Sequence, residues 1–394
     1  MTLVSNRPAP SGNGAARQGI GAYAAGVRAV VGLEMRQRMR SRGWYIMLAI
    51  WFVIIAAVTA LTWRSWDIQR GYLSAQDQAV GAPGSMIFEV VLAFVLLFGL
   101  MVAPAFSANA INGDRAGGTL AILQVTMLTT GQILWGKFLA SWLAGLGFLL
   151  VSVPFLVFAI AQGGLGAAHI LVALLLLAVE LGVVCALGVG ISALASRPLF
   201  SIVVTYLVVA ALVFGTLIAF GLGAMVSNGT VKANEVYYKN TFVEGDVATL
   251  ANGEELYAQP EPKDITDQNS DYACFGPLNE VTAVRTDRVA WMLAMNPFVV
   301  VADAIPYASK TQENMNGQGA FAMISQGARY AQAGPEVTQQ CANGKVAPSF
   351  VEQKTPLWPL GLGLQLLVAA GVLALGWRAL RTPAGKLPKG TRIA

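Results

Sequence analysis

Few residues of this chain could do chemistry. Its 394 residues include one histidine, His169, so a Ser–His–Asp triad would need that residue, and the sequence has neither an H-E-x-x-H motif nor the Cys/His spacing of a zinc site. Gly131–Lys137 fits the G-x-x-x-x-G-K spacing of a phosphate-binding loop, but Phe138 follows where that loop needs Ser or Thr, and no strand precedes it. We therefore expect no catalytic residue, metal or bound nucleotide on this chain.

Two acidic residues lie inside apolar runs. Glu180 is near the middle of its run, where a charge costs about 2.5–3.5 kcal/mol to insert into a bilayer. It could belong to a translocation path or couple ions, or it could hydrogen-bond a neighbouring helix, including a helix of a second copy. We favour the second interpretation because structural polar contacts are common in helix bundles. Glu89 is near the outer end of its run, and we expect it to be a hydrated interfacial residue.

The elements that must position these residues are membrane-spanning helices. The chain is 55% hydrophobic and 12% charged, against roughly 25% charged residues in a soluble domain. Six stretches reach the length of about 20 mostly apolar residues that a spanning helix needs. They are Trp44–Thr62, Met86–Ser107, Phe138–Ala161, His169–Ala195, Leu199–Met225 and Pro359–Trp377. Because the runs are continuous and do not alternate with a period of two, the sequence predicts an all-α integral membrane protein rather than a barrel.

The basic residues set the orientation. With the N-terminus inside the cell, fifteen Lys and Arg but only two acids, Glu34 and Asp114, lie on the inner side. This excess fits the positive-inside rule, and it predicts a multi-pass protein with both termini in the cytoplasm. Residues 226–356 then lie outside and carry a net negative charge. The overall charge of +5 therefore reflects membrane topology, and we expect no nucleic-acid partner.

Residues 1–22 are predicted to be a flexible cytoplasmic tail, and 23–43 an amphipathic helix on the inner membrane surface. Apolar residues recur there at helical spacing, with Arg36 and Arg40 on the other side. The apolar positions are Tyr23, Val27, Val30, Val31, Met35 and Met39. Arg38 and Arg42 fall on the apolar side, and we expect them to extend toward the headgroups. A plain basic flank that stops membrane transfer is an equally good interpretation of this pattern.

A polar segment, 108–137, joins the second and third spans. Gly117-Gly118 permits a sharp bend, and Thr119 could cap a short helix that begins at Leu120. A short helix at the membrane surface can sit in a groove of a soluble partner and transmit its motion to the spans. The alternative is an ordinary surface loop that binds nothing.

The outer segment 226–356 is long enough for a small domain. Its apolar stretch 289–308 is interrupted by Asn296-Pro297 and by Asp303, which favours interfacial or re-entrant helices. A seventh span is the alternative, but it would place the basic tail 381–394 outside, against the charge rule. Cys274 and Cys341 both lie in this segment, where they could form a disulfide or remain two free thiols. The sixth span, 357–380, follows.

Three local features resemble the permease subunit of type-2 ATP-binding-cassette (ABC) exporters. Leu33–Arg42 is similar to the basic elbow helix that precedes the first span in that family. Asp114–Leu120, Met127–Thr130 and Gly136-Lys137 are similar to its coupling-helix region, except that Ala121 replaces a common acidic residue. Asn296-Pro297-Phe298 is similar to its external Asn-Pro segment.

The resemblance implies a function and its partners. The chain would be a transport subunit that exports a substrate and binds no cofactor, while ATP and Mg²⁺ are held by cytoplasmic ATPase subunits. It would form a dimer with a second copy or a paralogue, among the lipids of a bacterial cytoplasmic membrane. The residues implied for ATPase docking are Asp114, Arg115, Gly118, Thr119, Leu120 and Leu123, and those of the elbow helix are Glu34, Arg36, Arg38, Arg40 and Arg42. The sequence does not select a cargo.

Two functions of other classes remain as alternatives. One is a proton- or ion-coupled secondary transporter, for which Glu180 would be the coupling residue. The other is a membrane-anchored assembly or sensor protein that acts through residues 226–356. Neither accounts for the polar segment between the second and third spans.

Overall fold

A computed structural model describes most of the chain. The described residues are 19–74, 83–118, 128–238, 248–249, 255–256, 262–269, 271–306, 319–347 and 355–381. Within them, six helices are long and apolar enough to cross a membrane, which confirms the predicted architecture. They are α2 (Arg42–Ser74), α3 (Pro83–Ser107), α6 (Thr130–Ala161), α7 (Ala167–Leu194), the continuous series α8 (Pro198–Ala210), η1 (Ala211–Gly215) and α9 (Thr216–Val226), and α14 (Trp358–Leu380).

Two of these helices extend well beyond the predicted spans. The first span was expected to end at Thr62, but α2 continues to Ser74, where the Arg64–Asp67 ion pair (2.9 Å) lies along the added turns. The third span was expected to begin at Phe138, but α6 begins at Thr130. Its start is fixed by a capping box, in which Thr129 and Gln132 exchange side-chain to backbone hydrogen bonds. The phosphate-loop spacing therefore lies in the first turns of a helix.

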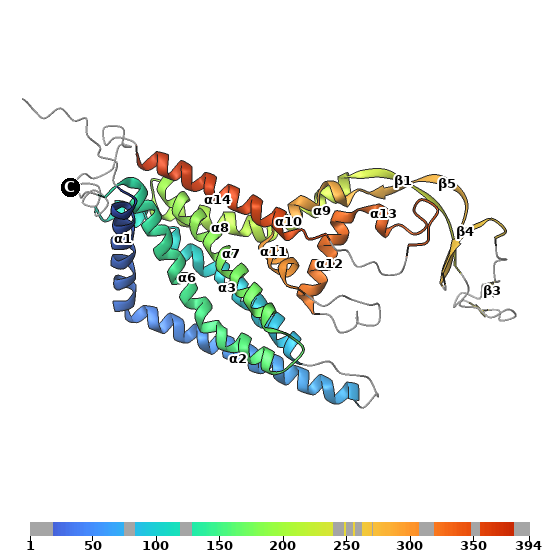
Figure 1. The fold of residues 1–394 in the computed structure, drawn as a ribbon, viewed down its shortest axis with the longest axis horizontal. Helices are drawn as coiled ribbons and strands as arrows, with labels where there is room; N and C mark the ends of the chain where they lie inside the picture. The colour runs from blue at the N-terminus through green and yellow to red at the C-terminus, as the bar shows by residue number, and fades with distance from the viewer. Residues whose placement is uncertain are drawn as a thin grey trace, which may run out of the picture.

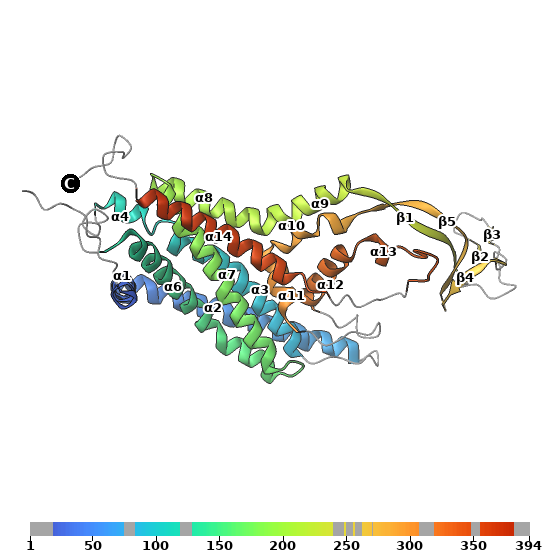
Figure 2. The same ribbon diagram turned by 45° about the horizontal axis from the view of Figure 1, so that its top comes forward.

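Helix α1 (Ile20–Arg40) precedes the first span and ends at Ser41. Figure 1 shows it running across the ends of the spanning helices, at a steep angle to α2, and Figure 2 shows it nearly end-on. It begins three residues before the predicted helix, and Arg42 belongs to α2 instead. Met39, which was assigned to the apolar face, is exposed.

Helix α7 lies at the centre of the bundle, packed on α3, α6 and α14. Its sequence is apolar all round, which is typical of a helix buried on every side. Glycines allow its neighbours to come very close. A Cβ on Gly188 would lie 2.0 Å from Ser107 Oγ of α3, and a Cβ on Gly190 would lie 3.0 Å from the backbone of Val372 in α14. Larger residues at these two positions would push the helices apart.

The apolar stretch after the fifth span forms two short helices, α10 (Ala290–Ala294) and α11 (Pro297–Ala304). Eight residues of α-helix measure about 12 Å, whereas the bilayer core is about 30 Å thick, so α11 does not cross it. Asn296 begins α11 by accepting a hydrogen bond from Phe298 N (2.9 Å). Its amide also donates to Val213 O (2.7 Å), within the π-helical turn η1 of the fifth span.

The outer segment also contains strands, which the all-α prediction did not foresee. Strands β1 (Asn228–Tyr238) and β5 (Tyr272–Val284) form a long antiparallel ribbon, and β4 (Ile265–Gln268) extends it in the order β1-β5-β4. A separate pair consists of β2 (Ala248–Thr249) and β3 (Glu255–Leu256). Figure 1 shows the ribbon projecting away from the helices, beyond the end opposite α1.

A disulfide joins Cys274 of β5 to Cys341. Both cysteines are fully buried and pack with Tyr272 of the same strand. The outer segment also contains η2 (Thr286–Arg288), α12 (Ala320–Ala333) and α13 (Pro335–Thr338), and α12 packs on η2, α11 and α13. The bond therefore attaches the ribbon to the chain that follows α13.

Glu89 is buried, which corrects the expectation that it is hydrated. Its carboxylate accepts a hydrogen bond from Phe321 N (3.1 Å), in the first turn of α12. Gly319 precedes this helix, and a Cβ there would lie 1.7 Å from Glu89 Oε2. The unpaired N–H groups and the positive dipole end of α12 stabilise the acid, so it does not need water.

Asp303 joins two helices of the outer segment to the sixth span. Its fully buried carboxylate accepts hydrogen bonds from Ser325 Oγ (2.9 Å) and from Arg329 Nε (2.5 Å) of α12. It also accepts from Leu357 N (2.6 Å) and Trp358 N (2.8 Å). The last two contacts cap the N-terminus of α14, so Asp303 connects α11 and α12 to the sixth span.

Asp303→Ala should lower the free energy of unfolding by about 3–5 kcal/mol, because it leaves Arg329 and the start of α14 without their buried partner. Asp67→Ala is the matched control, since the Arg64–Asp67 pair is exposed and should contribute at most about 1 kcal/mol. Denaturant unfolding of the purified protein in detergent measures both. Equal losses in the two variants would contradict the role assigned to Asp303.

Candidate functional site

The polar segment between the second and third spans begins with a short helix, α4 (Asn112–Ala116). It lies at the same end of the molecule as α1 (Figure 2). Gly118 follows with a φ of 73°, the left-handed conformation that the predicted bend required. Thr119, Leu120 and Leu123, which were predicted to dock an ATPase, lie outside the described residues.

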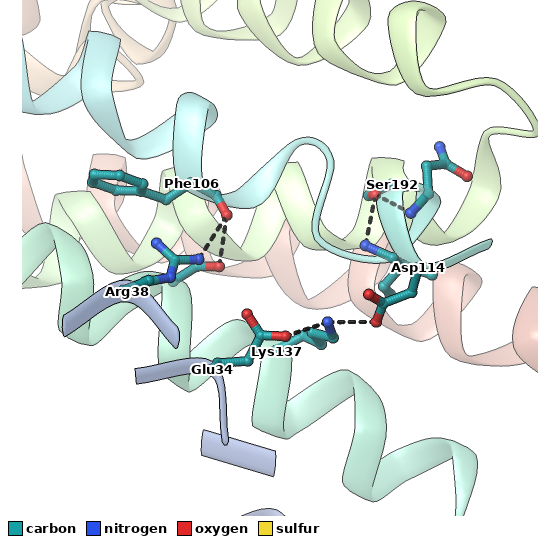
Figure 3. A network of polar contacts seen from close by, with 9 residues as sticks. Glu34, Arg38, Phe106, Asp114, Lys137 and Ser192 are labelled. Atoms are coloured by element: carbon teal, nitrogen blue, oxygen red, sulfur yellow. Dashed lines mark hydrogen bonds and ion pairs between the residues drawn. The ribbon is translucent and has the colours of Figure 1, made fainter. Parts of the chain in front are cut away.

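Lys137 joins three elements at this end of the bundle (Figure 3). Its ammonium forms ion pairs with Glu34 of α1 and with Asp114 Oδ2 of α4, the latter at 2.5 Å. Only 5% of the Lys137 side chain is exposed, against 18% for Glu34 and 23% for Asp114. A buried ammonium needs a paired charge, and here α1 and α4 each supply one to α6.

Helix α1 packs directly on the first turns of α6. A Cβ on Gly26 of α1 would lie 2.4 Å from Gln132 Nε2, and a Cβ on Gly136 of α6 would lie 2.6 Å from Val30. The Gln132 amide also donates to Tyr23 O (3.2 Å), so the residue that caps α6 also holds α1. The two helices therefore contact each other along several turns, beyond the ion pair.

Arg38 points into the protein, which corrects the expectation that it extends toward the headgroups. It donates to Phe106 O (3.3 Å), and its guanidinium lies 4.9 Å from the centre of the Phe106 ring. Ser141 Oγ donates to the same carbonyl (3.0 Å). The cause is the end of α3 at Ser107, which leaves its last carbonyls in need of donors. Burial lowers the pKa of Arg38 and the charge of Glu34 raises it, but the guanidinium stays protonated.

Helix α4 is tied to the end of α7. Ser192 Oγ of α7 accepts hydrogen bonds from Ile111 N and Asn112 N, both at 3.1 Å (Figure 3). Arg115 donates to Ala195 O (2.7 Å), which follows the last turn of α7. A cation there also opposes the negative end of the helix dipole.

The structure thus brings four of the predicted site residues together: Glu34 and Arg38 of α1 with Asp114 and Arg115 of α4. Their side chains contact this chain itself, and the docking role of Asp114 and Arg115 stays a prediction. Arg36, Arg40 and Arg42 are exposed and lie outside the cluster.

Sequence reasoning missed several members of the cluster. Lys137 was considered for the basic excess, the coupling motif and the rejected phosphate-loop spacing, and Gln132, Ser141 and Ser192 were not singled out. One feature of the sequence could have indicated these contacts. A lysine close to the start of an apolar run needs acidic partners from other segments. Nothing in the sequence shows which acids these are.

Glu180 has a different environment. It is 1% exposed, on the side of α7 that faces Gln365 of α14. Neither of its carboxylate oxygens has a hydrogen-bond partner within the part of the chain that the structure describes, and the same holds for Gln365 Oε1. The Gln365 amide donates to Met295 O (3.0 Å) instead. Glu180 therefore lies inside the bundle, on the helix that α4 contacts.

Comparison with known protein families identifies a match over most of the chain. The model of a family described as ABC-2 family transporter protein matches residues 28–341. The match includes most of α1, all of the ion-pair cluster and the outer segment as far as Cys341. No curated protein matches the chain.

The Lys137 cluster predicts energetic coupling between α1 and α6. Lys137→Met should be strongly destabilising because it removes the buried cation that pairs with both Glu34 and Asp114, and Glu34→Gln should be less destabilising. The double variant should lose less free energy of unfolding than the two single variants together, with a coupling energy of about 0.5–3 kcal/mol. Denaturant unfolding in detergent measures the free energy of unfolding of the wild type, both single variants and the double variant.

Arg36→Gln provides the control for this cycle, because Arg36 is an exposed residue of the same helix. When Arg36→Gln is combined with Lys137→Met, the losses in free energy of unfolding should simply add. Additivity of Glu34→Gln with Lys137→Met would show that the ion pair does not hold α1 to α6.

Proposed function

Because this chain belongs to the ABC-2 transporter family, we propose that it is the permease subunit of an ATP-driven exporter whose ATP-hydrolysing subunits are separate chains. The protein is a multi-pass membrane protein of a transporter family, a transport subunit rather than a catalytic chain. ABC-2 permeases generally work with cytoplasmic ATPase subunits. ATP and Mg²⁺ would bind to those subunits, and this chain would hold neither.

The Lys137 cluster is the observation that carries the proposal. A push on the segment that contains α4 acts on Asp114, which is ion-paired to Lys137 of α6. Lys137 is in turn paired with Glu34 of α1. Rigid-body motion passes through elements that cannot slide independently, and these pairs join α4, α6 and α1 in that way.

A second route leads from α4 to the centre of the bundle. Arg115 and the backbone N–H of Asn112 donate hydrogen bonds to the C-terminal end of α7. Helix α7 in turn packs on α14 through Gly190 and Gly376. A displacement of α4 would therefore tilt α7 against α3 and α14. We propose that such a tilt opens the path of the substrate.

The proposal places α1, α4 and both termini in the cytoplasm, and the ribbon of β1 and β5 outside. The basic residues near the span ends support this orientation. The disulfide between Cys274 and Cys341 also supports it, because disulfides persist in oxidising compartments.

A dimer is part of the proposal. The fifth span exposes large apolar residues along its length, including Leu199, Phe214 and Leu222. In a bilayer these side chains face either lipid or another helix. We propose that a second permease, identical or paralogous, covers part of this surface.

Glu180 favours a second candidate function, ion-coupled secondary transport. It is a buried acid in the membrane without a hydrogen-bond partner in the described chain, as expected of a residue that takes up a proton. Transport that continues without any ATPase and stops when an uncoupler is added would favour this function.

The orientation can be tested with single cysteines in a Cys185→Ala background. Arg28→Cys lies on the exposed side of α1, and Lys232→Cys on the exposed side of β1. In intact cells, a membrane-impermeant maleimide should label position 232 and leave position 28 unlabelled until the membrane is opened. The reverse pattern would invert the topology.

The docking role of the coupling segment can be tested by deleting residues 117–123. The deletion should abolish co-purification of the ATPase, because it removes the predicted docking helix while leaving Asp114 and Arg115 in place. Gel filtration in detergent should show an intact, monodisperse protein. Arg36→Gln serves as the control that keeps the partner, and unchanged co-purification after the deletion would refute the docking assignment.

A further inference from the structure

An apolar groove of about 580 Å³ lies between α6, α7 and α14. Trp135, Phe138 and Trp142 of α6 form one wall, and Leu366, Ala370 and Trp377 of α14 form another. Trp135, Leu366 and Trp377 are each more than one-third exposed, so the groove is open along its side. All three helices cross the membrane, and this opening therefore faces lipid.

The depth of the groove matches one leaflet of a bilayer. On α14 its lining runs from Leu366 to Trp377, eleven helical steps of about 1.5 Å that together rise by about 16 Å. The hydrocarbon core is about 30 Å thick, so one leaflet takes up about 15 Å of it. Trp377 is near the end of the span and Leu366 near its middle. The groove thus extends from the interface to the bilayer centre and ends there.

Polar and charged groups lie at the interfacial end of the groove. Tyr23 Oη and Trp377 Nε1 both lie close to Gly131, where a Cβ would be 2.9 Å from the first and 3.7 Å from the second. Arg381 is exposed and its guanidinium lies 4.2 Å from the Trp377 ring centre. Tyr and Trp rings prefer the headgroup level of a membrane, and a guanidinium there attracts lipid phosphate.

We propose that this groove binds one acyl chain of an anionic phospholipid from the leaflet that contains α1, with the headgroup phosphate at Arg381. The side opening, the one-leaflet depth and the single basic end each fit such a lipid. A helix of a second copy would require an apolar wall that continues across the membrane, whereas this groove stops near the centre. The lipid would wedge between α6 and α14 and contact α1 at Tyr23.

The proposal depends on the protein spanning a membrane and is independent of ATPase docking. Loss of ATPase binding would leave the lipid site unaffected, and loss of the lipid site would leave the docking assignment standing. The two can therefore be tested separately, on the same purified full-length chain.

Native mass spectrometry of delipidated protein, titrated with dioleoyl phosphatidylglycerol, tests the groove. Ala370→Trp fills it and should weaken binding of the first lipid at least tenfold. Leu375→Trp adds the same ring at an exposed position of α14 outside the groove, and should bind like the wild type. Equal binding by both variants would overturn the proposal.

Arg381→Gln tests the headgroup contact. It should reduce the preference for dioleoyl phosphatidylglycerol over dioleoyl phosphatidylcholine by about fivefold, the effect of one basic residue near an anionic surface. An unchanged preference would remove Arg381 from the site and with it the assignment of an anionic lipid.

Two further measurements avoid the bulky tryptophan substitutions, and the first uses the wild-type protein. A density map of the wild-type protein in phosphatidylglycerol nanodiscs should show an elongated density between α6 and α14, ending at Trp377. Ala370→Cys in the Cys185→Ala background, oxidised in native membranes, should remain uncrosslinked. An empty groove in the map, or a disulfide between two copies through position 370, would refute lipid as the occupant.

Discussion

At the end of the molecule that contains α1 and α4, the arrangement of the helices depends on one constraint, the burial of the Lys137 ammonium. A cation with 5% of its side chain exposed cannot be left unpaired, and its two carboxylates come from α1 and α4. Neither acid is on the helix that carries the lysine. The three elements are therefore held in one arrangement by charge, and the glycine contacts of Gly26 and Gly136 fix how closely α1 approaches α6. If α1, α4 or α6 moved alone, an ion pair of Lys137 would be separated where little water can replace it.

Buried charges also hold elements together at the opposite end of the bundle, where carboxylates accept hydrogen bonds from helix N-termini. Glu89 of α3 accepts a hydrogen bond from the start of α12, and Asp303 of α11 accepts two from the start of α14. These acids attach the outer segment to the second and sixth spans. Because α7 packs on both α3 and α14, the charge-paired ends of the molecule are connected through its closely packed centre.

Sequence reasoning predicted what depends on length and local pattern, and it missed what depends on distant partners. Hydropathy alone predicts six spans, because a helix must be long and apolar to cross a bilayer. The inward turn of Arg38 depends on a carbonyl 68 residues away, and the burial of Glu89 on an amide 232 residues away. The partners of Asp114 and Arg115 are likewise set by tertiary packing. The ribbon was not predicted from the sequence, although the Val and Tyr residues of Asn228–Tyr238 are typical of strands.

The buried charges differ in how the fold compensates the cost of removing them from water. Lys137, Asp303 and Glu89 each have partners that offset desolvation, so their burial stabilises a specific arrangement. Glu180 lies in the apolar centre of α7, where neither carboxylate oxygen has a hydrogen-bond partner in the described chain, so its insertion into the membrane is costly. Helix α7 is also the one whose last turns are bonded to α4. Glu180 therefore lies on the helix that a moving coupling segment would displace, facing α14 across the interface that such a movement would change.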